Sequence, residues 1–183
     1  MPHGRDDGRR VTRGDLGAWL IKGNADLVDL TGRFARDPRV TSWCVRPGYR
    51  ARLMGAGQPV VFWASGSRGR LPYGVWGIGR LTGEPEPGPD VRAPWTVPLD
   101  LTVLPEACRL SRDRLRADPR LAGLEVFRQP QAANPSYLTR AQFTALVDHL
   151  PGEVAAAGHH RPPPRIRAGA GGEPGTTSAP ATW

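Results

Sequence analysis

The side chains that could carry out catalysis are scattered along this sequence of 183 residues. It has no Gly-x-Ser-x-Gly nucleophile turn, no His-Glu-x-x-His metal site and no glycine-rich phosphate loop ending in Lys-Ser or Lys-Thr. Cys44 has no neighbouring histidine to activate its thiol, and the carboxylates are not paired for acid–base chemistry. His149 ends an amphipathic segment, where a solvated surface histidine is the simpler interpretation. The sequence therefore predicts no enzymatic activity, no bound metal and no cofactor.

Tryptophan and arginine point instead to the binding of nucleic acid. Trp43 lies within residues 33–70, a stretch with eight arginines and a single acidic residue, Asp37. Guanidinium groups attract phosphates whatever the base sequence, and an indole offers a face on which an unpaired base stacks. The formal charge of the chain is +8, but nearly all its basic residues are arginine, so coding bias contributes to that total. The local clustering is the better evidence, and a merely solvated basic surface is the alternative.

The elements that position these residues follow from the pattern of apolar side chains. Strands are predicted at residues 18–21, 40–45, 60–65, 74–81, 95–104 and 124–127. Helices are predicted after the capping residue Asn24, over 110–117 and after the capping residue Thr139, with a short helical turn at 49–54. Gly77 or Gly79 is expected to bend or bulge its strand. We therefore predict an α+β domain, a small, closed or nearly closed β-barrel of five to six strands with peripheral helices.

Both ends of the sequence differ in composition from its middle. Residues 1–15 are charged and glycine-rich, and residues 152–183 consist largely of Gly, Ala and Pro. Such segments bury too little apolar surface to offset the entropy of ordering, so we expect two disordered tails around one domain at 16–151. There is no long apolar run, and Cys44 and Cys108 have no metal-binding spacing. We expect a cytoplasmic protein with no signal peptide, disulfide or membrane contact.

Six segments, taken in order, resemble EVE domains, which belong to the PUA-like superfamily and are relatives of YTH domains. The segments cover most of residues 18–150 and read WLIKGN at 19–24, SWCVR at 42–46, YRAR at 49–52, VFWAS at 61–65, GVWGIG at 74–79 and NPSYLT at 134–139. The resemblance implies a PUA-like barrel that binds a modified nucleobase without catalysis. In EVE domains the base is chiefly a modified cytosine in DNA, and in YTH domains it is N6-methyladenosine in RNA.

The resemblance also implies roles for single residues. Trp43 matches the tryptophan that stacks on the base, Lys22 and Asn24 match residues lining the pocket, and Ser65 matches a serine that ends a later strand. With the other polar and aromatic candidates, the predicted base-binding residues are Lys22, Asn24, Trp43, Cys44, Trp63, Ser65, Trp76 and Gln129. The arginines predicted to hold the flanking phosphates are Arg46, Arg50, Arg52, Arg68 and Arg70.

Some positions depart from the family pattern and leave alternatives open. Gly23 stands where many relatives have Ser, and Cys44 stands where EVE domains often have Asp. The second aromatic residue of the pocket has no clear counterpart, and the open alternatives are Trp63, Tyr73, Trp76 and Trp95. The identity of the base, and the choice between DNA and RNA, therefore stay open.

Two other functions are alternatives to a reader. One is an ASCH-like amidohydrolase acting on a modified nucleoside, in which Lys22 and Glu84 are loose counterparts of the catalytic Lys and Glu. The other is an interaction module whose pocket is vestigial. For the reader we expect a monomer whose partner is nucleic acid containing a modified base, with any effector being a separate protein.

Overall fold

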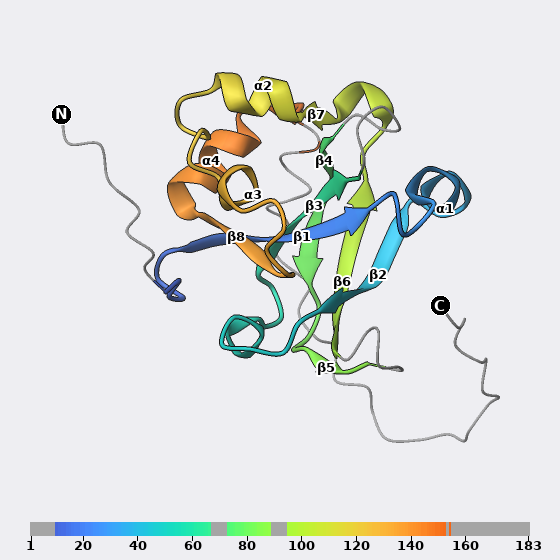
Figure 1. Ribbon diagram of the computed structural model, residues 1–183, viewed down its shortest axis with the longest axis vertical. Coiled ribbons are helices and arrows are strands. Elements are labelled where there is room, and N and C mark those ends of the chain that lie inside the picture. Colours follow the sequence, from blue (N-terminus) through green and yellow to red (C-terminus); the bar gives the residue numbers. More distant parts are fainter. Residues whose placement is uncertain (1–9, 67–72, 89–94, 153, 155–183) are drawn as a thin grey trace, which may run out of the picture.

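One mixed β-sheet organises the molecule (Figure 1). The computed structural model describes residues 10–66, 73–88, 95–152 and 154. The strands that form the sheet, in the spatial order of the main path, are β2 (Arg39–Val45), β6 (Trp95–Val103), β4 (Gly74–Leu81), β3 (Pro59–Ser65), β1 (Leu16–Asn24) and β8 (Ser136–Thr139). The short strands β5 (Glu86–Pro87) and β7 (Leu110–Ser111) pair with β6 and β4. Only β1 and β3 run parallel among these pairs.

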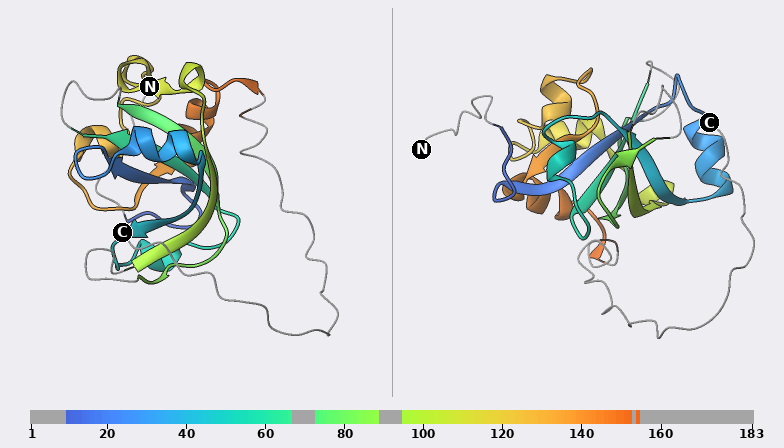
Figure 2. Two further views of the ribbon diagram at one scale, coloured as in Figure 1. Left: turned by 90° about the vertical axis from the view of Figure 1, so that its right-hand side faces the viewer. Right: turned by 90° about the horizontal axis from the view of Figure 1, so that it is seen from below.

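The sheet is strongly curved but open, as the side view in Figure 2 shows. The α+β class is confirmed, whereas the closed barrel is not formed, because no ladder joins the edge strands β2 and β8 within the described residues. The edge strand β8 is short and pairs with β1 only from Leu16 to Leu20. Among the described residues, the rest of that edge of β1 has no strand partner.

The β4 strand is irregular close to the predicted glycines. Its pairing with β3 shifts register between Phe62, which faces Gly77, and Trp63, which faces Val75. The extra residue is therefore Trp76, directly before Gly77. At Gly79 the neighbouring strand β6 comes so close that a Cβ atom would overlap the backbone of Asp100 and Leu101. Glycine is required there by the close approach of two strands.

Short helices lie on both sides of the sheet, α1 alone on one side and the remaining α-helices grouped on the other (Figures 1 and 2). The helices are α1 (Leu30–Arg36), η1 (Ala51–Leu53), η2 (Glu106–Cys108), α2 (Arg112–Ala117), α3 (Glu125–Arg128) and α4 (Arg140–Val147). Thr139 caps α4 as predicted and forms a capping box with Gln142. Among the described residues, no helix reaches the length and apolar character needed to cross a bilayer.

Three sequence predictions about elements are wrong. A strand is predicted at residues 124–127, but Glu125–Arg128 form the helix α3. The N–H of Gln129 donates to the carbonyl of Glu125 at 2.7 Å. A short apolar run does not distinguish a strand from a buried helical turn. Asn24 ends β1, and the cap of α1 is Asp29, whose Oδ1 accepts the N–H of Gly32. The predicted tails are also too long, because Val11 is buried and Val154 packs against core residues. Residues 1–9, 153 and 155–183 lie outside the described part of the chain.

The two faces of the sheet carry separate hydrophobic cores. One contains Trp19, Phe62 and Trp76 and is covered by α1. The other contains Leu20 and Trp63 and packs against the three remaining α-helices. Neighbouring residues of a strand point to opposite faces, so Phe62 and Trp63 belong to different cores. Trp43 packs on the first core, so it can contact Phe62 but not Trp63.

Candidate functional site

The indole of Trp43 lies at the gap between β2 and the unpaired part of β1. It is half-buried and packs on the first core, with its ring perpendicular to Phe62 at a centroid distance of 4.9 Å. Its Nε1 donates a hydrogen bond of 3.1 Å to the backbone carbonyl of Lys22 on β1. The ring is therefore fixed by one strand on each side of the gap, as a rigid stacking platform requires.

Arg33 of α1 lies over this indole. Its guanidinium carbon is 4.9 Å from the centroid of the Trp43 ring and 5.9 Å from that of Phe34. Burial lowers the pKa of the Arg33 guanidinium, while the charge of Asp37 partly offsets this effect. A planar cation thus covers the indole, an arrangement with favourable cation–π energy. The same contact shows that the ring is not enclosed by aliphatic side chains alone.

Gly23 explains one departure from the family pattern. A Cβ atom there would collide with the ring of Phe62 and lie 3.2 Å from Cζ2 of Trp43 and from Cδ2 of Leu30. The glycine is needed because three side chains converge on the backbone of β1. A serine at this position would force Phe62 or Trp43 to move.

The gap between β1 and β2 is bridged by Asn134, a residue that we did not assign to the site from the sequence. Its Nδ2 donates to the carbonyl of Lys22 at 2.9 Å and to that of Cys44 at 3.4 Å. Its Oδ1 accepts the N–H of Lys22 at 2.8 Å, and its own carbonyl accepts the N–H of Arg46 at 2.9 Å. One side chain therefore replaces the missing ladder. Its position in the NPSYLT segment was the available signal.

The amine of Lys22 points away from the predicted pocket. Its Nζ donates to the carbonyls of Pro130, at 3.1 Å, and of Ala132. Burial lowers the pKa of this amine, the nearby Glu125 carboxylate opposes that shift, and Arg50 adds to it. The predicted contact of Lys22 with a base is therefore corrected: its side chain secures the segment that carries Asn134, and its backbone holds Trp43.

Asn24 and Ser65 are brought together, as predicted, because they pair at the ends of the parallel strands β1 and β3. The Ser65 hydroxyl donates to the carbonyl of Gly23 at 3.0 Å, and Oδ1 of Asn24 accepts the N–H of Asp26 at 2.9 Å. A surface hollow of about 450 Å³, lined by residues 25–31, begins beside Asn24. Trp43 does not line this hollow, so the expectation that it forms the floor of the pocket is not met there.

Two predicted pocket aromatics are corrected. Trp63 points to the opposite face of the sheet, where it is 3% exposed and packs against Phe127. Trp76 shares the core of Phe62 but is 2% exposed, and the guanidinium of Arg109 lies 4.0 Å from its ring centroid. Neither indole has a face open to a base.

Tyr73 lies nearer to the end of the sheet where Asn24 and Ser65 meet. Its hydroxyl donates to the carbonyl of Gly66, and Gly66 lies against Ala25. Cys44 is exposed on β2, and Gln129 is exposed at the end of α3, directly before Pro130. Of the four open alternatives for a second aromatic, Tyr73 fits this position best.

The predicted phosphate-binding arginines divide into three groups. Arg46 and Arg52 are exposed beyond the end of β2 and remain candidates. Arg50 is corrected: it forms a bidentate ion pair with Glu125, at 2.8 and 3.0 Å, and donates to the carbonyl of Pro135. Its guanidinium supports the fold and is not available to a phosphate. Arg68 and Arg70 lie outside the described residues.

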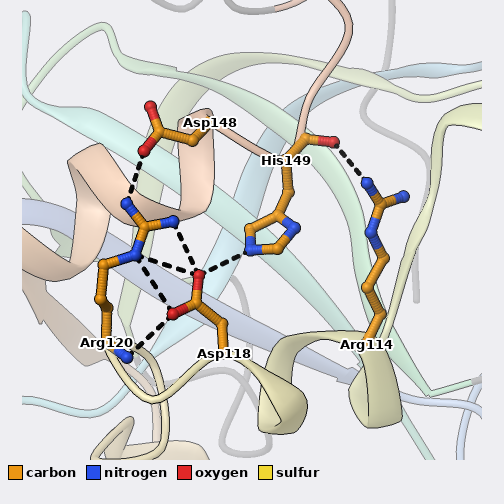
Figure 3. Close-up of polar contacts among 5 residues, drawn as sticks. All are labelled: Arg114, Asp118, Arg120, Asp148 and His149. Carbon is orange, nitrogen blue, oxygen red and sulfur yellow. Dashed lines mark hydrogen bonds and ion pairs between the residues drawn. The ribbon is translucent and has the colours of Figure 1, made fainter.

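A second polar cluster joins the helices on the far side of the sheet (Figure 3). Asp118 accepts hydrogen bonds from Arg120 and lies 2.9 Å from Nε2 of His149, and Arg120 also pairs with Asp148. These hydrogen bonds lower the pKa of the Asp118 carboxyl well below its usual range, those of Arg120 most of all. His149 is therefore not the simple surface residue we expected but ties α4 to the turn after α2. In the described part of the chain, no three His, Cys, Asp or Glu residues gather as a metal site.

Comparison with known proteins gives information on the fold alone. No family model matches the sequence, and no curated protein matches it. The solved structures that resemble it include a hypothetical protein from Leishmania major, 16% identical, which covers 73% of this chain and 94% of its own, with a TM-score of 0.52. Proteins from Pseudomonas putida and Pseudomonas syringae are 20% and 19% identical, both cover 72% of this chain and 98% and 97% of their own, and both have TM-scores of 0.52.

Proposed function

We propose that this protein is a non-catalytic reader that binds nucleic acid at a modified base, with modified cytosine in DNA as the first candidate. The observation that carries the proposal is the indole of Trp43, fixed between β1 and β2 and covered by the planar guanidinium of Arg33 at 4.9 Å. A nucleobase is also planar and stacks on the same kind of surface. A bound base displaces the Arg33 guanidinium from the Trp43 ring or stacks between the guanidinium and the ring.

Polar groups at the end of the sheet suit the recognition of a base edge. Asn24 and Ser65 face each other in the ladder, and Gly23 between Asn24 and Trp43 keeps the backbone close to the indole. Amide and hydroxyl groups pair with the edge of an unstacked base. Tyr73, at the same end of the sheet, is the proposed second aromatic of the pocket.

Basic residues flank Trp43 at both ends of β2. Arg36 precedes its first residue, and Arg46 and Arg52 follow its last. Arg39, the first residue of β2, forms an exposed ion pair with Asp100 at 2.8 Å. A strand of seven residues spans about 23 Å, which is enough to contact phosphates on both sides of one bound base. This placement supports nucleic acid over an isolated nucleoside as the partner.

The resemblance to EVE domains supports the same proposal and its finer fold. The gap between β1 and β2, which Asn134 bridges, corresponds to the place where a PUA-like barrel would close. We therefore propose a PUA-like domain in which side-chain hydrogen bonds take the place of one ladder.

The geometry gives no support to an ASCH-like amidohydrolase. The Lys22 amine donates to two backbone carbonyls and does not point to an open pocket. Glu84 follows Leu81, whose N–H bonds to Gln58 before the start of β3, whereas Lys22 pairs with Trp63 near the end of that strand. Gln58 and Trp63 are five residues apart, which is about 16 Å along a strand, so Glu84 and Lys22 belong to opposite ends of β3. Glu125, the nearer carboxylate, is held by Arg50.

Binding to a panel of labelled oligonucleotides tests the proposal. Fluorescence anisotropy would compare single strands and duplexes carrying unmodified cytosine, 5-methylcytosine, 5-hydroxymethylcytosine or N6-methyladenine. We expect one modified base to be preferred, and Trp43→Ala to weaken its binding by about ten- to hundredfold, since stacking on an aromatic side chain is worth about 1–3 kcal/mol. The matched control is Phe127→Ala, which removes a half-buried aromatic ring from the opposite face of the sheet.

The outcome that contradicts the proposal is equally specific. If no modified oligonucleotide is preferred over the unmodified one, or if Trp43→Ala binds as tightly as the parent while remaining folded by circular dichroism, the reader function is wrong. If Phe127→Ala loses binding to the same extent as Trp43→Ala, the loss reflects the fold and not a stacking contact.

A further inference from the structure

Tyr49 repeats the arrangement found at Trp43. It lies two residues before η1, is half-buried and packs against the same core as Trp43. Its hydroxyl accepts a hydrogen bond of 3.2 Å from Nε of Arg50, which is itself held by the buried carboxylate of Glu125. The exposed Arg10 lies over the ring, with its guanidinium carbon 5.2 Å from the centroid. Tyr49 is thus a second aromatic ring that the fold holds in place and an arginine covers.

The surface around Tyr49 carries exposed positive charge. Arg46 precedes Tyr49 by three residues and Arg52 follows it by three, and within the described residues neither of these exposed guanidinium groups has a carboxylate partner. The N–H of Arg46 donates to the carbonyl of Asn134 at 2.9 Å. Arg46 is therefore fixed at the end of the gap between β1 and β2, on the way from Trp43 to Tyr49.

The exposed carboxylates of this region do not remove that charge. Asp15 accepts a hydrogen bond of 2.6 Å from the hydroxyl of Thr12. Glu86 on β5 pairs with Thr96 from the side of β6 that faces away from β2. Two strand spacings, about 10 Å, therefore separate Glu86 from the strand that carries Trp43.

The opposite end of β2 is close to neutral. Arg39 forms an ion pair with Asp100 at 2.8 Å, and its N–H donates to the carboxylate of Asp37. The hollow before α1 is lined by two further carboxylates, so Arg36 is the exposed cation left at that end. A polyanion bound at Trp43 is therefore attracted more strongly toward η1 than toward α1.

We propose, building on the reader function, that Tyr49 stacks an unpaired base of the strand that carries the modified base. Arg46 and Arg52 contact the phosphates of this segment, and the base takes the place of Arg10 on the ring. Chain length limits the distance between the Cα atoms of Trp43 and Tyr49 to about 21 Å, and small single-strand-binding domains cover about four or more nucleotides. The ligand is therefore a single strand that runs from Trp43 toward η1, because a base paired in a duplex cannot stack on a tyrosine.

Abasic scanning of a single strand tests this second site. The probes are 11-nucleotide DNAs with one central 5-methylcytosine or 5-hydroxymethylcytosine and one abasic site at each flanking position in turn, measured by fluorescence anisotropy with the full chain. An abasic site removes a base but keeps its phosphate. We expect a loss of about fivefold at one position on one side of the modified base, and of less than about twofold at every position on the other side.

Variants of Tyr49 identify the contact. Tyr49→Leu should weaken binding by about fivefold and should no longer respond to the abasic site that matters in the parent, because ring and base form one contact. Tyr49→Phe keeps the ring and should bind like the parent. The matched control is Phe127→Leu, since Phe127 is also half-buried and covered by a guanidinium, that of Arg116 at 5.1 Å, but lies on the opposite face of the sheet.

Arg46→Gln gives a result that does not depend on the tyrosine ring. The slope of log affinity against log salt concentration should decrease by about 0.7, the value for one phosphate contact on a single strand. Arg39→Gln removes a charge that Asp100 already balances, and should change the slope by less than about 0.3.

The results separate the second site from the reader function. Equal abasic losses on both sides, or a Tyr49→Leu variant that responds to abasic sites as the parent does, would overturn the second site and leave the reader function intact. A full duplex that binds as tightly as the single strand, or an unchanged salt slope for Arg46→Gln, would also overturn it. If neither modified cytosine is preferred over cytosine while the effects at Tyr49 persist, modified cytosine is wrong as the ligand and the single-strand site stands.

Discussion

Removal of the Asn134 side chain should destabilise the protein by about 2–3 kcal/mol. Asn134→Ala deletes two good hydrogen bonds, at 2.8 and 2.9 Å, and a longer one of 3.4 Å to Cys44. Each good bond contributes about 1 kcal/mol, and the N–H of Lys22 is left without its partner at an additional cost of about 1 kcal/mol. The Lys22 carbonyl still accepts Nε1 of Trp43, which limits the total.

Urea unfolding, followed by circular dichroism, measures this loss directly. The midpoint should fall with an unchanged slope, because the surface exposed on unfolding stays the same. Asn134→Asp is the sharper variant: it conserves shape but turns a carboxylate oxygen toward the carbonyls of Lys22 and Cys44. We expect it to be at least as destabilising as Asn134→Ala at neutral pH.

Gln131→Ala is the matched control, since Gln131 is exposed on the same segment and should change the free energy of unfolding by no more than about 0.5 kcal/mol. The reasoning is refuted if Asn134→Ala costs less than about 0.5 kcal/mol, or if Asn134→Asp is as stable as the parent. Either result would mean that the bridge between β1 and β2 contributes nothing to holding the gap closed.

Two further predictions concern ion pairs away from Trp43. Arg50→Ala leaves the buried carboxylate of Glu125 without its bidentate partner and should lower the free energy of unfolding by about 3 kcal/mol, whereas Arg52→Ala, at an exposed position nearby, should change it little; chemical denaturation checks both. Asp118 has a lowered pKa in the folded protein, so its stabilising effect is present above the usual carboxyl pKa of about 4 and is lost as the pH falls below it. Asp118→Asn should therefore flatten the fall of Tm below pH 4, and an unchanged acid profile would show that the ties to Arg120 and His149 do not stabilise the fold.

Much of the fold could be predicted because its signals are local. The strands carry runs of apolar residues, and Thr139, three residues before Gln142, is a typical N-cap that predicts the start of α4. The α3 helix was not predicted because a run of four residues is too short to distinguish the hydrophobic period of a helix from that of a strand. The open sheet was not predicted because closure depends on pairing between strands far apart in the sequence, which no local pattern shows.

The site was predicted less well because its contacts span the sequence. Asn134 meets Lys22 across 112 positions, and Arg50 meets Glu125 across 75. Nothing local to Arg50 separates it from the exposed Arg46, so an arginine cluster cannot show which members pair internally. The prediction that Trp63 lines the pocket failed for a different reason. Trp63 and Phe62 are neighbours on one strand, so only one of them can lie on the same face of the sheet as Trp43. The pairing partners of β3, which the sequence does not state, decide which one it is.

Packing divides the proposed site into a fixed part and an exchangeable part. The indole of Trp43 is held by Phe62, by the close approach of Gly23 and by the carbonyl of Lys22, so a change there alters stability and binding together. Arg33, by contrast, comes from α1 and covers the ring without forming its support. A reader needs this division, because a bound base must meet a rigid surface while its cover gives way. Replacement of Arg33 should therefore lower the free energy of unfolding by no more than one cation–π contact, about 0.5–2 kcal/mol, while it changes the affinity for nucleic acid. This combination distinguishes a binding pocket from a half-exposed part of the core.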